Sequence, residues 1–426
     1  MLKRIFTVAV GAALGVGLTC LAGRLSLAWS LFPNRGLDRS ITYFRDVMKV
    51  VNENYVDAAQ ANYDQLTHAA LEGMVMSLDP HSQFLSAKSF DELEDEMSGG
   101  FGGIGVQIDM VKSRVTVVVP IPGTPGARAG LRHGDEILRV NGRSLEKLGL
   151  DEIVTLMRGK PRTKITLSVL RPATQKIFDV TLTREVIKVD SVRNVHMLPG
   201  HIGYIELTEF SDNTADQFGK ALDTLLQQGA TSLVLDLRNN PGGLLDAAVA
   251  VLNPFFKKGE LIVYTQGRSS SDREEYRAEG DGDPLTLPMA VLINAQSASA
   301  AEIVAGALKD TGRAVIVGER SFGKGSVQSI FKLRNGEGLR LTTAHYYTPS
   351  GAIIHEHGIE PQIKVVLSES EDEKIELQME RDDLSDAKEF QERYGFAPIA
   401  DRQLQAAADV LHGVQTFELH DTALVK

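Results

Sequence analysis

The sequence is nearly devoid of cysteine: its 426 residues include one, Cys20. That residue lies inside an apolar run near the N-terminus, so the rest of the chain has no thiol and can form no intrachain disulfide. A fold without such crosslinks must be stabilised by its own hydrophobic core. The hydrophobic fraction of 43% is ordinary for a globular protein, and the length predicts several domains.

The chain also has no excess of basic residues. It contains 45 Lys and Arg and 56 Asp and Glu, which gives a net charge of −11. Neutralising a nucleic-acid backbone requires a dense basic surface, so nucleic acid is not an expected partner. Nine of the acidic residues lie between positions 368 and 386, with only two basic ones. This stretch is more typical of a solvated, mobile segment than of an acidic recognition tail.

The N-terminus predicts export. Lys3 and Arg4 precede the apolar run 5–22, and Ser26-Leu27-Ala28 follows, which is the pattern of a signal peptide over residues 1–28 with cleavage after Ala28. An uncleaved membrane anchor is the alternative, since the run approaches bilayer length. Thr19 before the cysteine argues against a lipoprotein. We therefore expect an exported, periplasmic protein, with membrane association if the segment is retained.

Two amphipathic helical patterns follow, within a predicted N-terminal helical region at 29–96. Apolar residues recur at steps of three and four over 41–55 and again over 63–78, where Asp79-Pro80 ends the pattern. Helices this short need a partner for their apolar stripes. Either the same chain or a second copy would serve, and the pattern leaves both open.

Short β patterns with many glycines and prolines occupy residues 97–188. The glycines at 100, 102 and 105 fit a dinucleotide fingerprint, but a predicted strand follows them where that motif needs a helix. We prefer a loop whose backbone N–H groups hold a carboxylate beside an exposed strand edge, with Gly103, Ile104, Gly105 and Val106 as its residues.

Strands and helices alternate over residues 189–367. Strands are predicted at 202–207, 232–237, 289–294 and 314–318, with helices after the first and third. The pattern indicates an α/β core with a mixed sheet, in which the loops at the strand ends place the chemistry.

Three of those loops carry residues suited to acyl transfer. In 236–243, adjacent glycines let backbone N–H groups face an oxyanion. In 294–303, serines precede a predicted helix. In 321–328, a lysine lies between two glycines, where desolvation would lower its pKa enough for it to act as a general base. A serine and a neutral lysine together replace the serine–histidine pair of other hydrolases.

Two resemblances follow from these motifs. The run Ala129-Gly130-Leu131 to Asn141-Gly142 resembles a PDZ domain, over about ninety residues. Most of the chain from about 38 to 365 resembles the carboxyl-terminal processing, or tail-specific, serine proteases. The motifs that carry this second resemblance are Leu78-Asp79-Pro80-His81-Ser82, Asn240-Pro241-Gly242-Gly243, Ser297-Ala298-Ser299-Ala300, Phe322-Gly323-Lys324-Gly325, Tyr347-Thr348-Pro349-Ser350-Gly351 and Gly358-Ile359-x-Pro361.

The protease resemblance implies specific catalytic roles and requires no metal or cofactor. It implies Ser299 as nucleophile, Lys324 as general base and Gln328 as the residue that orients the lysine. It also implies oxyanion donors at Gly243 and at the Ala300 N–H, although the sequence does not separate Gly242 from Gly243. Relatives often have serine at position 301, which is alanine here. The 25-residue spacing from Ser299 to Lys324 nevertheless fits the family's middle serine, and Ser297 is then expected to be structural.

The PDZ resemblance implies recognition of a peptide's C-terminal carboxylate, so unfolded or C-terminally exposed proteins are the expected substrates. Arg158 matches a PDZ arginine that couples to the active site in some relatives. Arg162, however, stands where relatives often have glycine, which weakens this expectation. In the last segment, 368–426, an amphipathic helix is predicted over 402–413. Self-association as a homo-oligomer, an adaptor protein and packing within the chain are its open alternatives.

Other functions fit less well. A PDZ domain used only as a packing lid and an inactive PDZ scaffold on a protease-like fold are the main rivals. Ser321-x-x-Lys324 and Ser211-Asp212-Asn213 resemble motifs of penicillin-recognising enzymes, but in reversed order and without Lys-Thr-Gly. His355 and His357 invite a metal interpretation, yet no third ligand lies nearby in the sequence, and we expect them on a strand near solvent.

Overall fold

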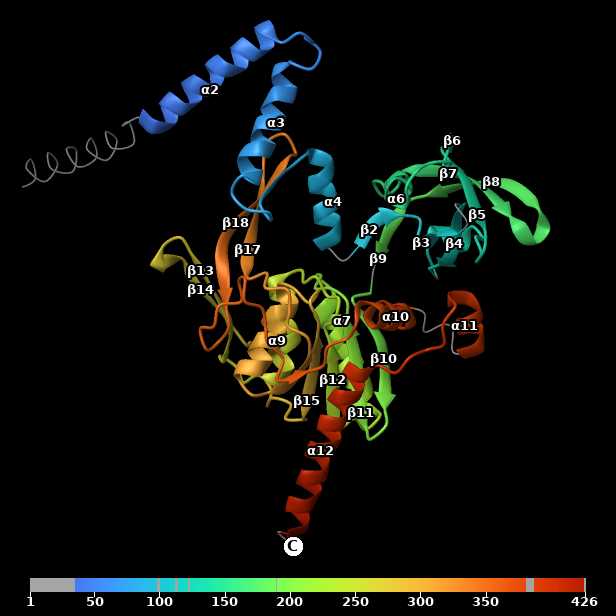
Figure 1. The fold of residues 1–426 in the computed structure, drawn as a ribbon, viewed down its shortest axis with the longest axis vertical. Coiled ribbons are helices and arrows are strands. Elements are labelled where there is room, and N and C mark those ends of the chain that lie inside the picture. The colour runs from blue at the N-terminus through green and yellow to red at the C-terminus, as the bar shows by residue number, and fades with distance from the viewer. Residues whose placement is uncertain are drawn as a thin grey trace, which may run out of the picture. The chain divides into compact units, whose positions relative to one another are not determined.

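The computed structural model describes residues 35–97, 100–111, 114–121, 123–188, 190–380 and 387–424. The predicted signal peptide, with Cys20, therefore lies outside the described residues. Contacts divide the chain into two compact units, one ending at Pro80 and the other beginning at His81. Among the helices in these ranges, none is both long enough and apolar enough to cross a membrane. The ribbon is shown in Figure 1.

Within the described residues 35–80, the unit that ends at Pro80 contains two helices, α2 (Arg35–Asn54) and α3 (Tyr63–Met76), in agreement with the predicted patterns. The Asn62 side chain caps α3 by accepting a hydrogen bond from the Gln65 N–H. Helix α2 has no buried residue, so its apolar side chains remain exposed.

Residues of the β-rich predicted region form a small barrel-like domain with two helices, as expected for a PDZ domain. Strands β2 (Gly100–Gly103) and β9 (Glu185–Lys188) pair with each other, and the main sheet has the order β3-β4-β5-β7-β8, with β6 on β5. Its elements are β3 (Val106–Val111), β4 (Arg114–Pro120), α5 (Pro125–Arg128), β5 (Glu136–Val140), β6 (Arg143–Ser144), α6 (Leu150–Met157), β7 (Lys164–Arg171) and β8 (Lys176–Thr183).

Arg184 holds the C-terminal end of α6 in place. Its guanidinium donates to the carbonyl oxygens of Met157 and Leu156 at 2.9 and 3.0 Å, which satisfies acceptors that a helix end leaves open. Burial among these dipoles lowers the pKa of Arg184. Arg162, in the following turn, has a φ of 68°, a conformation that favours glycine.

The α/β core is built on a six-stranded sheet of order β10-β11-β12-β15-β16-β19, parallel except for β10. Its strands and the helices that follow them are β10 (Val192–Leu198), β11 (Ile202–Leu207), α7 (Thr214–Gln227), β12 (Ser232–Asp236), α8 (Leu245–Leu252), β15 (Met289–Ile293), α9 (Ala300–Asp310), β16 (Ala314–Gly318) and β19 (Ile363–Lys364). All five residues of β12 and of β15 are buried, as expected for strands in a parallel sheet covered on both faces.

A second sheet of five strands completes this core, with the order β1-β18-β13-β14 and β17 paired to β18. The strands are β1 (Gln83–Leu85), β13 (Leu261–Gly267), β14 (Arg273–Arg277), β17 (Ser326–Lys332) and β18 (Gly338–Tyr347), and helix α4 (Ala87–Met97) follows β1. Strands β17 and β18 form the hairpin that begins directly after the predicted lysine loop.

The C-terminal segment contains α10 (Glu369–Glu380), α11 (Ala387–Tyr394) and α12 (Arg402–Leu424). The expectation of a mobile segment is wrong for 369–380, because Ile375 is buried and gives the helix an anchor. Ala407 and Leu411 of α12 pack on the sheet with Tyr204 and Val234. This part of α12 therefore buries its apolar stripe within the chain.

Candidate active site

Ser299 lies at the junction between a buried strand and a helix, immediately before α9. Its φ of 54° and ψ of −115° are unusual for a residue with a Cβ atom, and its side chain is 7% exposed. Such strain costs on the order of 1–3 kcal/mol and persists only where the surroundings impose it. The junction therefore holds one serine in a single, defined orientation.

Ser297 helps to build that junction and is structural, as expected. Its hydroxyl donates to the Leu237 carbonyl at 2.7 Å and accepts from the Asn294 N–H at 2.9 Å. The Ala298 N–H donates to the Asn240 carbonyl at 2.9 Å. These bonds tie the serine turn to the glycine loop that follows β12.

Ala301 is fully buried and belongs to the main hydrophobic core. A nucleophile at this position would face apolar side chains and not solvent. The alanine at a position where serine is frequent in relatives is thus compatible with an intact site at Ser299.

A buried glutamate that the sequence reasoning did not single out connects the serine and lysine segments. Glu302 Oε2 accepts the backbone N–H of Ser299 at 2.9 Å and that of Lys324 at 2.8 Å. Its Oε1 accepts the Gly323 N–H at 2.7 Å and the Ser321 hydroxyl at 2.5 Å. Because all four partners are donors, the side chain acts as an acceptor-only carboxylate.

Glu302 was recognisable in principle. Ser299-x-x-Glu302 has the spacing of a capping box, in which the third residue of a helix bonds back to the residue before its start. Burial raises the pKa of Glu302 while the four hydrogen bonds oppose that rise. What the local motif did not reveal is that the same carboxylate also binds a loop more than twenty residues away.

Lys324 lies between two glycines that the packing requires. Gly323 has a φ of 92°, and a Cβ atom on Gly325 would lie 2.2 Å from the His355 nitrogen. Desolvation by burial, followed by the positive charge of Arg340, lowers the pKa of Lys324, and the charge of Glu302 opposes this. The direction is the one that a general-base lysine needs.

Gln328 lies on β17, and its carboxamide nitrogen donates to the Ser326 and Thr342 hydroxyls at 2.9 and 3.2 Å. The structure thus gives this side chain a fixed position in the hairpin after the lysine loop. Its predicted effect on Lys324 stays a prediction.

The glycine loop after β12 runs against the start of α9. A Cβ atom on Gly242 would lie 2.6 Å from the Ser299 Cβ and 2.8 Å from the Ala300 nitrogen. The N–H of Gly242 already donates to Asn240 Oδ1 at 2.8 Å. In the described part of the chain, by contrast, the N–H groups of Gly243 and Ala300 have no acceptor. This difference favours Gly243 over Gly242 as the predicted oxyanion donor, a choice that the sequence left open.

The structure gives structural contacts to residues of the penicillin-recognising motif and of the histidine pair. The Ser321 hydroxyl is held between Glu302 and the Ile359 N–H, at 2.5 and 2.6 Å. His355 and His357 lie in a turn and not on a strand, so the expectation of a strand is wrong. The His355 ring packs on His345, with centroids 4.5 Å apart, while His357 bonds the His355 carbonyl.

The PDZ domain contains a cavity of about 200 Å³ between β3 and α6. It is lined by Phe101, Gly103, Ile104, Gly105, Val106, Gln107, Ile108, Val154, Met157 and Arg158. The predicted carboxylate loop, 103–106, therefore lines a real groove. Within the described residues, the N–H groups of Ile104 and Gly105 have no acceptor, so both remain available to an anion.

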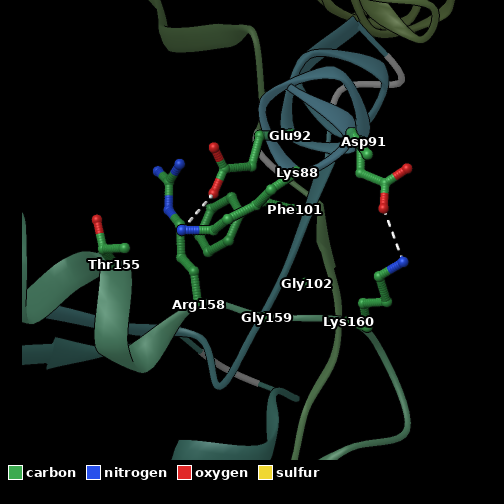
Figure 2. A pocket seen from close by; sticks show the side chains of 10 residues that line it. Lys88, Asp91, Glu92, Phe101, Gly102, Thr155, Arg158, Gly159 and Lys160 are labelled. Atoms are coloured by element: carbon green, nitrogen blue, oxygen red, sulfur yellow. Dashed lines mark ion pairs between the residues drawn. The ribbon is translucent and has the colours of Figure 1, made fainter. Parts of the chain in front are cut away.

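Arg158 lies at the end of this groove and borders a second cavity of about 370 Å³ on the side of α4. Figure 2 shows its side chain beside the Phe101 ring, with the guanidinium carbon 4.4 Å from the ring centroid. Lys88 pairs with Glu92, and Lys160 pairs with Asp91 at 2.7 Å. Among the described residues, Arg158 forms no ion pair of its own.

Comparisons with known proteins place the chain in a family. Residues 201–365 match the model of peptidase family S41, and residues 116–171 match a PDZ domain. A carboxy-terminal-processing protease of Bartonella bacilliformis is 40% identical over 355 residues, covering 82% of this chain and 81% of that relative. The chain belongs to peptidase family S41.

This S41 peptidase has other relatives with the same description. The carboxy-terminal processing protease CtpA of Bacillus subtilis is 36% identical over 371 residues, covering 86% of this chain and 78% of that relative. A solved photosystem II D1 C-terminal processing protease is 31% identical, covering 76% of this chain and 92% of that one, with a TM-score of 0.45. The predicted family, fold class and enzyme class, a serine peptidase with a PDZ domain, are confirmed.

Proposed function

We propose that this S41 peptidase is a serine endopeptidase with a Ser299–Lys324 dyad that cleaves exported proteins recognised through their C-terminal ends. The observation that carries the proposal is the shared carboxylate oxygen of Glu302. Because one atom binds the backbone N–H of both residues, the serine turn and the lysine loop have a common anchor inside the core. Preorganisation of this kind is what a dyad from two distant segments needs.

In the proposed mechanism, neutral Lys324 Nζ takes the proton of the Ser299 hydroxyl while Oγ attacks a peptide carbonyl carbon. The C–N bond breaks as the leaving amine receives that proton, and water then hydrolyses the acyl-enzyme. The free N–H groups of Gly243 and Ala300 are the donors for the tetrahedral oxyanion. Gln328 acts on Lys324 from the first strand of the hairpin, β17.

We propose that the PDZ groove holds the substrate's C-terminal carboxylate at residues 103–106. Two free backbone N–H groups suit an anion, and Ile104, Val106 and Met157 suit an apolar last side chain. The exposed edge of β3 adds the peptide as a strand, since among the described strands β3 pairs with β4 alone.

Arg158 couples the filled groove to turnover in this proposal. Its guanidinium is unpaired by any described carboxylate and borders the groove, so a bound C-terminus would change its surroundings. Arg158→Ala is expected to lower kcat more than it weakens peptide affinity. Equal kcat in variant and parent would refute the coupling.

We further propose export to the periplasm, through the N-terminal segment 1–28, and assembly as a homo-oligomer. The exposed apolar stripe of α2, with Ile41, Phe44 and Val47 all more than 40% exposed, is suited to a second copy of the chain. An adaptor protein is the alternative occupant. Sedimentation of the mature chain with and without charged substitutions in the stripe distinguishes the two.

The test of the main proposal compares the parent with Ser299→Ala and Lys324→Met. The substrates are an unfolded reporter with an apolar C-terminal tail and the same reporter with an amidated tail, and products are read by mass spectrometry. We expect cleavage only by the parent and mainly of the free-carboxylate reporter. Cleavage by Ser299→Ala would refute the proposed dyad. If the parent binds the tail but cleaves neither reporter, the inactive scaffold is favoured.

A further inference from the structure

Gln328 and Thr342 face each other across the hairpin of β17 and β18. They are directly opposed in the strand register, and the Gln328 carboxamide nitrogen donates to the Thr342 hydroxyl at 3.2 Å and to the Ser326 hydroxyl at 2.9 Å. A primary amide has two N–H groups, so these two bonds use both of them. Within the described part of the chain, the carboxamide oxygen has no hydrogen-bond partner. It is therefore the end of the side chain left to act on Lys324.

Thr342 is held in turn by Ser82, the last residue of the motif that begins at Leu78. The Thr342 backbone N–H donates to Ser82 Oγ at 3.1 Å, and the Ser82 hydroxyl donates to Thr342 Oγ1 at 3.5 Å. Ser82 is 3% exposed and directly precedes β1, which pairs with β18. A residue of the N-terminal motif is thus linked to Gln328 through Thr342 alone.

The strand pairing is irregular where these bonds form. Val327 opposes Ala344, whereas the next residue, Gln328, opposes Thr342, so that Thr343 is an extra residue in β18. A β-bulge of this kind disrupts the ladder locally and redirects side chains. The backbone ladder alone therefore does not fix the Gln328 carboxamide, and its hydrogen bonds to side chains do.

We propose that Thr342 and Ser82 are positioning residues of the peptidase, which orient the Gln328 carboxamide so that its oxygen is the end presented to the Lys324 amine. The inference rests on the proposed action of Gln328 on Lys324 and adds two residues to it. A neutral amine has two N–H groups and one lone pair. When one N–H donates to the carboxamide oxygen, the lone pair is left for the Ser299 proton.

The same orientation stabilises the charged amine. When Lys324 Nζ takes the Ser299 proton it becomes an ammonium group, and a hydrogen bond from a charged donor contributes more than one from a neutral donor. Gln328 keeps its own protons in this step, and the transferred proton later passes from Lys324 to the leaving amine. Loss of the orientation should therefore lower the pKa of Lys324 and weaken the lysine as a base.

The hairpin supplies a matched control. Thr343 is the next residue, it is exposed, and its hydroxyl forms a hydrogen bond of 2.6 Å with the Ser329 hydroxyl on β17. Thr343→Val therefore removes a threonine–serine hydrogen bond between the same two strands without touching Gln328. Thr342→Ser is the conservative variant, because it retains the hydroxyl that Thr342→Val removes.

The experiment measures kcat and KM for Thr342→Val, Ser82→Ala and Thr343→Val over a range of pH. We expect kcat to fall about 10-fold in Thr342→Val and about 3-fold in Ser82→Ala, with KM within about twofold of the parent. The midpoint of kcat against pH should move to lower pH in both, because the ammonium form loses a hydrogen bond while the charges of Glu302 and Arg340 that act on Lys324 are unchanged.

The control and the conservative variant give the other expected results. Thr343→Val should stay within about twofold of the parent, and Thr342→Ser should have a kcat at least about threefold higher than that of Thr342→Val. If Thr342→Val or Ser82→Ala keeps more than half of the parent's kcat, or if neither moves the midpoint, the proposal is overturned.

A double-mutant cycle shows whether the effect passes through Gln328. In a Gln328→Leu background, Thr342→Val should change kcat by less than about twofold, and a second loss of about 10-fold would overturn the proposal. If Gln328→Leu alone keeps the parent's kcat, the proposed action of Gln328 on Lys324 fails and the inference fails with it. If Gln328→Leu loses activity while Thr342→Val does not, only the positioning role fails. Should Thr342→Val not fold, Ser82→Ala takes its place in the same cycle.

Discussion

Glu302 Oε2 accepts the backbone N–H of Lys324 at 2.8 Å, and the same oxygen accepts the N–H of Ser299. The two residues proposed for the chemistry are thus held through their main chains, which leaves both side chains free to react. A carboxylate without exposure to water is costly unless its lone pairs are used, and here four donors use them.

Glu302→Gln should damage both activity and folding. The variant keeps one acceptor oxygen but places an NH₂ group against backbone donors, so the two loops lose their common anchor. We expect kcat/KM to fall by about 100-fold or more and the free energy of unfolding to fall by about 1–3 kcal/mol, measured by peptide cleavage and urea denaturation. Glu319→Gln is the control, since Glu319 accepts the Leu367 N–H outside the site. Equal effects of both variants on kcat/KM would contradict the anchor.

The pH dependence of kcat/KM should report the amine of Lys324. Burial and Arg340 lower its pKa below 10.5, and the neutral form is the active one, so kcat/KM rises as pH rises through the lowered pKa. Arg340→Gln removes the repelling charge, so we expect the midpoint to move to higher pH. Arg334→Gln, at an exposed turn of the same hairpin, should leave it in place.

Lys324 also links pH to stability. Between its folded pKa and the ordinary lysine value, the unfolded chain holds more protons at this site than the folded one. The free energy of unfolding contributed by Lys324 therefore increases with pH across that interval. Lys324→Met should flatten this dependence in urea titrations at several pH values, and an unchanged slope would show that the lysine amine is not buried.

The buried ion pairs of Arg238 should contribute to the free energy of unfolding. Its guanidinium pairs with Asp236 at 2.5 Å and with Asp401, ahead of α12, at 2.8 Å, while Tyr204 donates to Asp236 at 2.7 Å. Asp401→Asn leaves a buried cation with one partner fewer, so we expect a loss of about 3 kcal/mol in urea unfolding. Asp409→Asn, on the exposed side of α12, should cost less than about 0.5 kcal/mol. A loss of similar size in both variants would mean that the ion pair contributes little.

Gly105→Ala should abolish peptide binding by the PDZ domain. Gly105 has a φ of 67°, and an added Cβ atom would lie 2.3 Å from the Thr124 Cβ. Gly123→Ala is a matched control, because Gly123 has a φ of 77° with no atom within 4 Å of an added Cβ. Both variants bear the cost of a left-handed alanine, about 1 kcal/mol, but only Gly105→Ala distorts the loop. Fluorescence anisotropy with a labelled peptide ending in an apolar residue measures the difference, and equal affinities would refute the assigned groove.

Local patterns determined the helices α2 and α3, the alternation of strands and helices in the core, and the candidate residues Ser299 and Lys324. The elements follow from the period of the apolar residues, and the two candidates from short motifs together with the family resemblance that these motifs carry. Long-range contacts decided the remainder. That Glu302 also binds the lysine loop became visible only when α9 and that loop came together, and the free N–H of Gly243 only when Asn240 was seen to bind Gly242. The packing of α12 on the sheet of its own chain was also decided by the fold. An apolar stripe looks the same in the sequence whether it packs within the chain or against another protein.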